Sequence, residues 1–196
     1  MPRGHTTRSS IVEQSLALAS EVGLGALTIG DLAARTGMSK SGLFAHFGSK
    51  ESLQLQILTE ARRRFVEMVA APAFEQPRGL PRLHALFDNW LAWSRADFAP
   101  GGCLFIATAS ELDDRPGPLR DALVAMQREW LEAIATAARQ AVEAGALAST
   151  TDPEQFAYAL YSIALAHHHF SRLLRDAGAE DRARRAWADL LARVSA

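Results

Sequence analysis

Apolar residues recur at helical spacing along most of the chain, and the strict alternation expected of β-strands is scarce. Early in the chain, Ile29, Leu32 and Ala33 give one apolar face to a short predicted helix. Thr28 is suited to cap this helix, with Asp31 in the reciprocal position of a capping box, where Asp is a weaker variant of the usual Glu or Gln. The pattern therefore predicts a helix that begins just after Thr28.

A second short helix is predicted directly after the first. Gly37 lies where the chain must turn sharply, and Ser39 is suited to cap a helix from about Lys40 to His46. Leu43 and Phe47 form its inner face. Its outer face carries small and polar residues, namely Lys40, Ser41, Gly42 and His46. The two helices outline a helix-turn-helix, whose second helix is shaped for the major groove of DNA.

The segment before this motif extends the helical pattern. Apolar residues between Ile11 and Ala19 predict an amphipathic first helix that Gly23 closes. Residues 1–8 are interpreted as a short polar arm with two basic side chains, Arg3 and Arg8.

Six further helices are predicted behind the first three, separated by breaks rich in proline and glycine. They span about residues 49–70, 80–95, 103–112, 119–143, 152–175 and 180–193. Pro72 and Pro77 are expected to break the first of these helices. We expect an all-α protein of about nine helices, with a helix-turn-helix domain over residues 1–48 and a second helical domain over residues 49–196, to which the family resemblance described next assigns ligand binding and dimerisation.

Together these residues resemble the TetR family of transcriptional regulators. The resemblance covers about residues 8–58 and includes Gly23, Thr28-Ile29, Asp31-Leu32-Ala33, Gly37-Met38-Ser39, Leu43-Phe44-Ala45-His46-Phe47, Lys50 and Leu53. It implies a DNA-binding regulator, most often a repressor that an effector releases from its operator. Phe44 departs from the family, which usually has a Tyr whose hydroxyl reaches a phosphate; Phe44 is left to pack on the sugar–phosphate backbone or on a thymine methyl.

The resemblance and the outer face of the second helix together suggest which residues contact double-stranded DNA. They are Thr28, Ser39, Lys40, Ser41, Gly42, Phe44, His46 and Lys50. The only two lysines of the chain lie in this segment, and Lys50 falls in the first turn of a helix, where backbone N–H groups also favour a phosphate. Residues 1–50 carry five Lys/Arg and three Asp/Glu, which gives +2, against −1 for the whole chain. DNA binding is therefore expected to depend on a local patch.

The last two predicted helices are unusually apolar. Their apolar residues are Phe156, Leu160, Ile163, Leu165 and Phe170, followed by Trp187, Leu190, Leu191 and Val194. One interpretation is that they complete the core of the second domain. The resemblance implies instead that they pair with their copies in a homodimer, and a dimer would present two recognition helices to a palindromic operator.

An aromatic stripe follows the middle helices of the second domain. Such a stripe usually belongs to a core, whereas the resemblance implies a cavity for an unidentified small-molecule effector. The candidate lining residues are Phe87, Trp90, Cys103, Phe105, Met126, Trp130, Tyr158 and Tyr161, and Trp93 extends the same stripe.

Cys103 and three consecutive histidines raise the question of chemistry beyond binding. Cys103 lies at a predicted helix N-terminus, where the helix dipole favours thiolate, so it is either a sensor of electrophiles or oxidants or a small buried hydrophobe. His167, His168 and His169 point about 100° apart on a helix, so they cannot jointly hold one metal ion. Ordinary packing and surface roles account for them.

Several classes of protein are disfavoured. The chain has one cysteine, which excludes an intramolecular disulfide framework and fits a cytoplasmic location, and no apolar signal or membrane-spanning segment is apparent. No metalloprotease motif, P-loop or nucleophile–base motif occurs, and the acidic cluster of Glu111, Asp113 and Asp114 is interpreted as a solvated helix end, so we expect no enzyme, cofactor or metal. A DNA-binding activator or an architectural protein is the alternative to a repressor.

Overall fold

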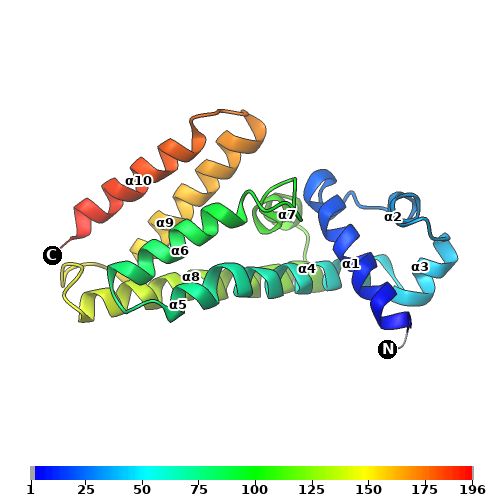
Figure 1. Ribbon diagram of the computed structural model, residues 1–196, viewed down its shortest axis with the longest axis horizontal. Helices are drawn as coiled ribbons and strands as arrows, with labels where there is room; N and C mark the ends of the chain where they lie inside the picture. The colour runs from blue at the N-terminus through cyan, green and yellow to red at the C-terminus, as the bar shows by residue number, and fades with distance from the viewer. Residues whose placement is uncertain (1–2, 196) are drawn as a thin grey trace. The chain divides into compact units, whose positions relative to one another are not determined.

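The computed structural model describes the backbone of residues 3–195 and the side chains from residue 8 onward. Within residues 3–195 the chain is helical without a β-strand, apart from one isolated bridge between Leu147 and Ser195 (Figure 1). Over the same residues the helices form nine segments, if the π-helical turns η1 and η2 are counted with the helices that they continue. The prediction of an all-α protein is confirmed.

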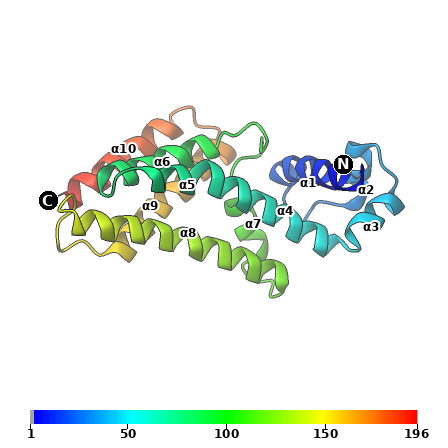
Figure 2. The same cartoon turned by 60° about the horizontal axis from the view of Figure 1, so that its bottom comes forward.

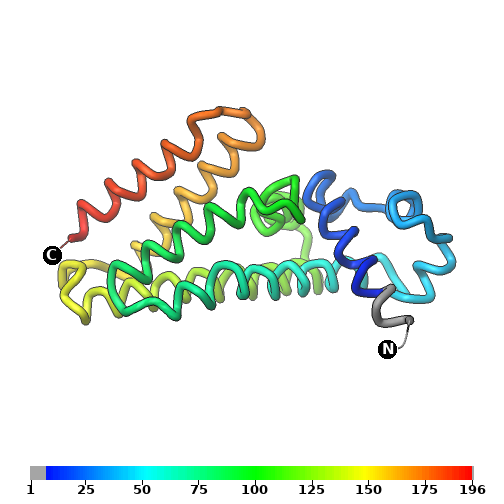
Figure 3. Tube along the Cα trace, viewed as in Figure 1, coloured from blue at the N-terminus to red at the C-terminus, as the bar shows by residue number. Residues whose placement is uncertain are grey.

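The helices follow one another in the order shown by the trace in Figure 3. Those of the first part are α1 (Arg3–Val22), α2 (Ile29–Thr36), α3 (Lys40–Phe47) and α4 (Lys50–Phe65), which continues through η1 (Val66–Ala70) into α5 (Ala71–Glu75). The later helices are α6 (Leu80–Trp93), α7 (Leu104–Leu112), α8 (Pro118–Glu143), α9 (Pro153–His168) with its extension η2 (His169–Leu173), and α10 (Ala179–Val194).

These helices group into two compact units. The first contains the chain up to Arg64 together with Arg95–Ala125, and the second contains Phe65–Ser94 and Met126–Ala196. The first unit therefore combines α1 to α3 with most of α4 and with α7. A division of function at residue 48 remains a prediction, because it concerns what each part binds.

The core of the first unit is built by the apolar faces of its helices. Leu16, Leu32, Leu43 and Ile57 come from α1, α2, α3 and α4 and are all fully buried. Each buried leucine or isoleucine of this kind stabilises the folded state by about 1.5–3 kcal/mol. This core fixes α3 with its inner face covered and its outer face exposed.

The predicted N-terminal arm is wrong for the described residues. Helix α1 begins at Arg3, so residues 3–8, which were interpreted as a short polar arm before the first helix, belong to that helix. Nε of Arg8 donates a hydrogen bond to Gln56 Oε1 at 3.0 Å, and its guanidinium lies 5.5 Å from the centroid of Phe47. These contacts with neighbouring helices stabilise the first turns of α1, which is why they are not an extended arm. The side chain of Arg3 lies outside the described residues.

The helix expected to end at Ala70 is longer than predicted. It passes through the wide turn η1 and continues to Glu75. Pro72 lies in the first positions of α5, directly after that turn, and a proline is tolerated where the local backbone does not require its missing N–H group. The break falls instead between Glu75 and Leu80, where Pro77 and Gly79 lie.

In the second unit, α9 and α10 form an antiparallel hairpin, which Figures 1 and 2 both show. Trp187 of α10 anchors it: its ring stacks on Phe87 of α6 with centroids 5.0 Å apart, and its Nε1 donates to Nδ1 of His84 at 3.2 Å. Helix α9 was expected to reach Arg175, but it changes to the π-helical turn η2 at His169 and ends at Leu173. None of the described helices is both long and apolar enough to span a membrane.

Candidate functional site

The start of α2 is fixed by a complete capping box. Thr28 Oγ1 accepts a hydrogen bond from the backbone N–H of Asp31 at 3.1 Å, and Asp31 Oδ2 accepts from the backbone N–H of Thr28 at 3.2 Å. Two N–H groups that a helix start leaves unpaired are thus satisfied. Gly37 ends α2 in the left-handed conformation, with φ of 68°, and creates the sharp turn toward α3.

Helix α3 presents a short outer face with small and polar side chains. Ser39 caps it by accepting a hydrogen bond from the N–H of Gly42 at 3.1 Å, while Leu43 and Phe47 are buried against the core. Outward lie Lys40, Ser41 and Phe44, which are exposed, and Gly42 and His46, which are half-buried. The four residues predicted for the outer face, Lys40, Ser41, Gly42 and His46, all lie outside the buried side of the helix, and Phe44 joins them there.

Phe44 is the one large apolar side chain of this face. It is 49% exposed, in contrast to the buried Leu43 and Phe47 of the same helix. A single exposed apolar side chain is common on protein surfaces, so the contact of Phe44 with DNA remains a prediction.

The two lysines have different surroundings. Lys40 crosses the first turn of α2, where its Nζ lies 3.7 Å from the position that a Cβ on Gly30 would take. Lys50 is half-buried, and its Nζ donates a hydrogen bond to the carbonyl oxygen of Gly25 at 2.7 Å. Lys50 was expected to contact a phosphate directly; in the structure one of its three donors is already used.

An ion-pair network joins α1 to α4. Glu60 accepts hydrogen bonds from Arg63 and Arg64, and Arg64 also reaches Glu13 of α1 at 3.0 Å. The hydrogen bond from Arg63 and the neighbouring guanidinium of Arg64 lower the pKa of Glu60 from 4.5 to about 2, although partial burial opposes this shift.

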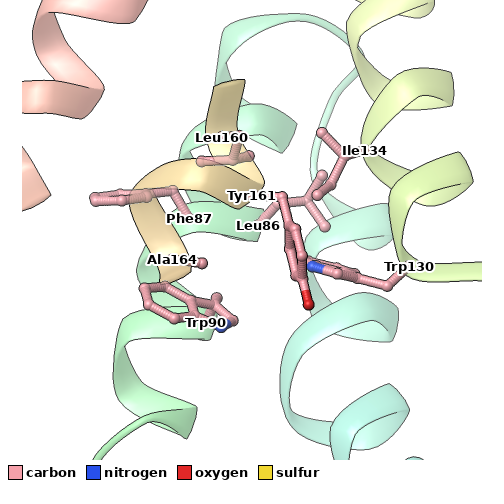
Figure 4. Close-up of a pocket in the computed structure, with 8 residues that line it drawn as sticks. All are labelled: Leu86, Phe87, Trp90, Trp130, Ile134, Leu160, Tyr161 and Ala164. Atoms are coloured by element: carbon pink, nitrogen blue, oxygen red, sulfur yellow. The ribbon is translucent and has the colours of Figure 1, made fainter. Parts of the chain in front are cut away.

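The second unit contains a small apolar cavity between α6, α8 and α9 (Figure 4). Its lining residues are Leu86, Phe87, Trp90, Trp130, Ile134, Leu160, Tyr161 and Ala164. Its volume is about 10 Å³, far below the range of about 300–1,000 Å³ typical of ligand pockets. A ligand of ordinary size would therefore have to displace some of the aromatic side chains.

Four of the eight residues predicted to bind an effector line this cavity: Phe87, Trp90, Trp130 and Tyr161. Met126 of α8 and Tyr158 of α9, the latter 68% exposed, are not among the residues that line it. Cys103 and Phe105 belong to α7 in the first unit. The aliphatic members were missed because the candidates were chosen mainly from an aromatic stripe. The helical spacing of Leu160 and Ala164 near Tyr161 would have found the two on α9.

Cys103 is the N-cap of α7 and is 3% exposed. The helix terminus favours a thiolate there, but burial opposes it and hinders the approach of a reagent. Of the three histidines, His167 is buried, His168 is half-buried and His169 is exposed. Burial and the nearby charge of Arg172 lower the pKa of His168 to about 4, so it is neutral at pH 7. Among the described side chains, no group of three or more His, Cys, Asp or Glu is placed to share a metal ion.

Of the apolar residues of α9 and α10 predicted for a dimer interface, some are buried within the chain and some are exposed. Phe156, Leu160, Trp187, Leu190 and Leu191 are buried within the chain, and Ile163 and Val194 are half-buried. The other two predicted residues, Leu165 and Phe170, are exposed, and with Tyr158, Leu173 and Leu174 they form an exposed apolar stripe along α9, η2 and the residue that follows. A groove of about 310 Å³ lies beside this stripe, lined by residues that include Ala166, Phe170 and Ala183.

Two family models match the chain. Residues 11–57 match the bacterial regulatory proteins of the tetR family, and residues 79–187 match the tetracyclin repressor-like C-terminal domain. The chain belongs to the tetR family. It is a DNA-binding transcriptional regulator, and tetR-family regulators are typically ligand-responsive repressors. They are not enzymes, which agrees with the expectation from the sequence.

Solved structures of tetR-family proteins share the fold. A TetR transcriptional regulator from Chloroflexus aurantiacus J-10-FL is 27% identical, with a TM-score of 0.86 over 98% of this chain and 96% of that chain. A regulator from Cytophaga hutchinsonii is 18% identical, with a TM-score of 0.83 over 100% and 98%. AibR, solved with isovaleryl coenzyme A and operator DNA, is 20% identical, with a TM-score of 0.71 over 83% and 85%. A comparison with curated proteins finds no match.

Proposed function

We propose that this tetR-family chain is a homodimeric repressor that holds a palindromic operator with two copies of α3 and is released from it by an apolar effector. The observation that carries the proposal is the outer face of α3, where Lys40, Ser41 and Phe44 are exposed on a helix whose other side is buried. A short helix of this kind enters the major groove, and its first residues reach the base edges.

The contacts divide into positioning and readout. Lys40 and Lys50 neutralise phosphates, and the capped helix starts at Thr28 and Ser39 add backbone N–H groups that also favour an anion. Ser41 and His46 face the base edges, Gly42 allows the helix to approach closely, and Phe44 packs on a thymine methyl or the sugar–phosphate backbone.

The exposed apolar stripe of α9 and η2 supports dimerisation through the last two helices. Five of the nine large apolar residues that are exposed among the described side chains lie between Tyr158 and Leu174. Several large apolar side chains exposed on one element are typical of a protein–protein interface. A second copy that covers it would set the spacing of the two α3 helices at about 34–36 Å, one turn of DNA.

The lining of the cavity supports an uncharged effector. Its eight lining residues include no Asp, Glu, Lys, Arg or His, and their polar side-chain atoms are the Tyr161 hydroxyl and the indole nitrogens of Trp90 and Trp130 (Figure 4). Burying an unpaired charge there would cost several kcal/mol, on the order of the whole binding free energy of a weak ligand. Modification of Cys103 is the second candidate trigger, and the burial of its thiol makes it the less favoured one.

Selection of bound duplexes from random-sequence DNA tests the proposal. Enrichment of a palindrome with half-sites one helical turn apart is the expected result, and enrichment of a single half-site would contradict dimeric readout. Bound sites that overlap promoters and lower transcription distinguish a repressor from an activator or an architectural protein. A Cys103→Ser protein that loses its response to electrophiles would favour the cysteine as the trigger.

A further inference from the structure

The loop between α1 and α2 is held from two sides by a carboxylate and a lysine. The backbone N–H of Gly25 donates a hydrogen bond to Oε2 of Glu111 at 2.5 Å, and the carbonyl oxygen of Gly25 accepts from Nζ of Lys50 at 2.7 Å. Glu111 lies at the end of α7 and Lys50 at the start of α4. A single glycine thus links the residue expected to hold a phosphate with a helix that carries no predicted DNA contact.

The carboxylate fits this loop because the loop contains glycine at two positions. A Cβ built on Gly23 would overlap Oε1 of Glu111, and a Cβ built on Gly25 would lie 2.7 Å from Oε2. Gly23 also has φ of 92°, which residues other than glycine rarely adopt. The side chain of Glu111 therefore occupies a cradle that any larger residue at either position would close.

The same hydrogen bonds fix the peptide planes of the loop. In the peptide between Leu24 and Gly25, the N–H is held by Glu111, and the carbonyl oxygen accepts from Nε2 of Gln54 at 2.7 Å. Once this plane is fixed at both ends, the next carbonyl, that of Gly25, has a defined direction toward Lys50. An ammonium group has three donors, so the one used here orients the head group and leaves two for a phosphate.

We infer that Glu111 is a positioning residue for DNA binding, which acts through Gly25 to hold Lys50 in place for a phosphate. This inference rests on the proposed phosphate contact of Lys50. Without the carboxylate, the glycine loop regains its conformational freedom and the lysine must be ordered when DNA binds. The affinity for DNA then falls by about five- to tenfold, the range that corresponds to ordering one long side chain.

A double-mutant cycle with Glu111→Leu and Lys50→Met tests the inference. Phosphate contacts are independent of sequence, so the probe is a random-sequence 30-base-pair duplex at several salt concentrations. Glu111→Leu is expected to weaken binding when Lys50 is present and to have no further effect in the Lys50→Met protein. Glu111→Gln keeps an oxygen acceptor for the Gly25 N–H and is expected to bind within about twofold of the original protein.

Gly25→Ala provides a second variant that leaves Glu111 in place. Its Cβ displaces the carboxylate, so its DNA affinity and salt dependence are expected to match those of Glu111→Leu. An equal loss from Glu111→Leu in both Lys50 backgrounds, or no loss at all, would overturn the inference while leaving the Lys50 contact standing. If Lys50→Met itself binds normally, both the phosphate contact and the inference fail. Circular dichroism and thermal melting establish that each variant is folded.

Discussion

The carboxylate of Glu60 accepts a hydrogen bond from Nε of Arg64 at 2.7 Å, one helical turn along α4. Both side chains are largely buried, with exposed fractions of 21% and 17%, and Arg64 extends the pair to Glu13 on α1. The ion pair therefore holds the first helix of the DNA-binding unit against α4. Because protonation of the Glu60 carboxylate breaks the ion pair, the stability of that unit depends on pH.

Glu60→Gln is expected to destabilise the protein by about 1–2 kcal/mol at pH 7, less than the full pKa shift implies because both partners keep some solvent contact. The pKa of Glu60 is depressed in the folded state, so its contribution is complete above the ordinary value of 4.5 and is lost as pH falls to about 2. In urea denaturation, the difference in the free energy of unfolding between Glu60→Gln and the original protein should vanish as the pH is lowered from 7 to 2. Glu13→Gln, which removes a more exposed partner, is the control and should cost less. A stability difference that does not change with pH would contradict the lowered pKa of Glu60.

The second unit depends on a buried arginine. The guanidinium of Arg82 is stacked 4.9 Å from the ring centroid of Phe74, and its Nη2 donates to the carbonyls of Phe74 and Gln76 at 2.9 and 2.8 Å. Arg82→Met would leave these carbonyls and the Gln140 amide without their donor, at a cost of about 2–4 kcal/mol. Arg82→Lys keeps the charge but cannot span all three acceptors. Its loss of stability should therefore lie between those of the original protein and the Met variant. A Met variant as stable as the original protein, measured by thermal unfolding, would show that water replaces the guanidinium without cost.

The local part of the site could be predicted from the sequence. The caps at Thr28 and Ser39 depend on hydrogen bonds that span three residues, so residue identity and spacing are enough to find them. The apolar spacing of α2 and α3 identifies their buried side for the same reason. Most helix limits were found to within a few residues because prolines and glycines mark them.

The long-range part could not be predicted. The hydrogen bond from Gly25 to Glu111 joins residues 86 positions apart, and Glu111 was interpreted as part of a solvated acidic helix end. Nothing in its neighbourhood in the sequence distinguishes it from Asp113, because the packing of α7 on the α1–α2 loop decides its role. The continuation of α4 past Ala70 was missed in the same way, since the turn η1 that precedes Pro72 leaves no sign in the sequence.

Phe44→Tyr tests whether the departure from the family weakens DNA binding. The added hydroxyl would extend from an exposed ring and reach a phosphate oxygen, which is expected to tighten binding by about three- to tenfold, the value of a typical net hydrogen bond. A neutral hydroxyl releases no counterion, so the slope of log K against log salt should stay unchanged. Lys40→Met is the contrasting control and should lower that slope by about 0.9. Fluorescence anisotropy with a labelled duplex gives both quantities.

A charge on the outer face of α9 should separate the proposed dimer. Leu165 is 42% exposed, and a glutamate in its place would bury an unpaired charge if a second copy covers this face. Leu165→Glu is therefore expected to be monomeric at micromolar concentration in analytical ultracentrifugation. Met68→Glu is the matched control, since Met68 is 40% exposed but lies on η1, and it should behave as the original protein does. A dimer that persists in the Leu165 variant would place the interface elsewhere.

The apolar cavity predicts a preference between two ligands of the same shape. The compounds 2-naphthol and 2-naphthoate both carry a flat two-ring body, but only naphthoate is anionic at pH 7. Because the lining offers no cation, transfer of the carboxylate into the cavity would leave its charge unpaired, and we expect naphthol to bind at least about tenfold more tightly. Binding can be followed by fluorescence of Trp90 and Trp130, which line the cavity. Ala164→Leu fills the cavity from α9 and should abolish the fluorescence change without unfolding the chain. Tighter binding of naphthoate than of naphthol would mean that the effector is recognised at a different, charged site.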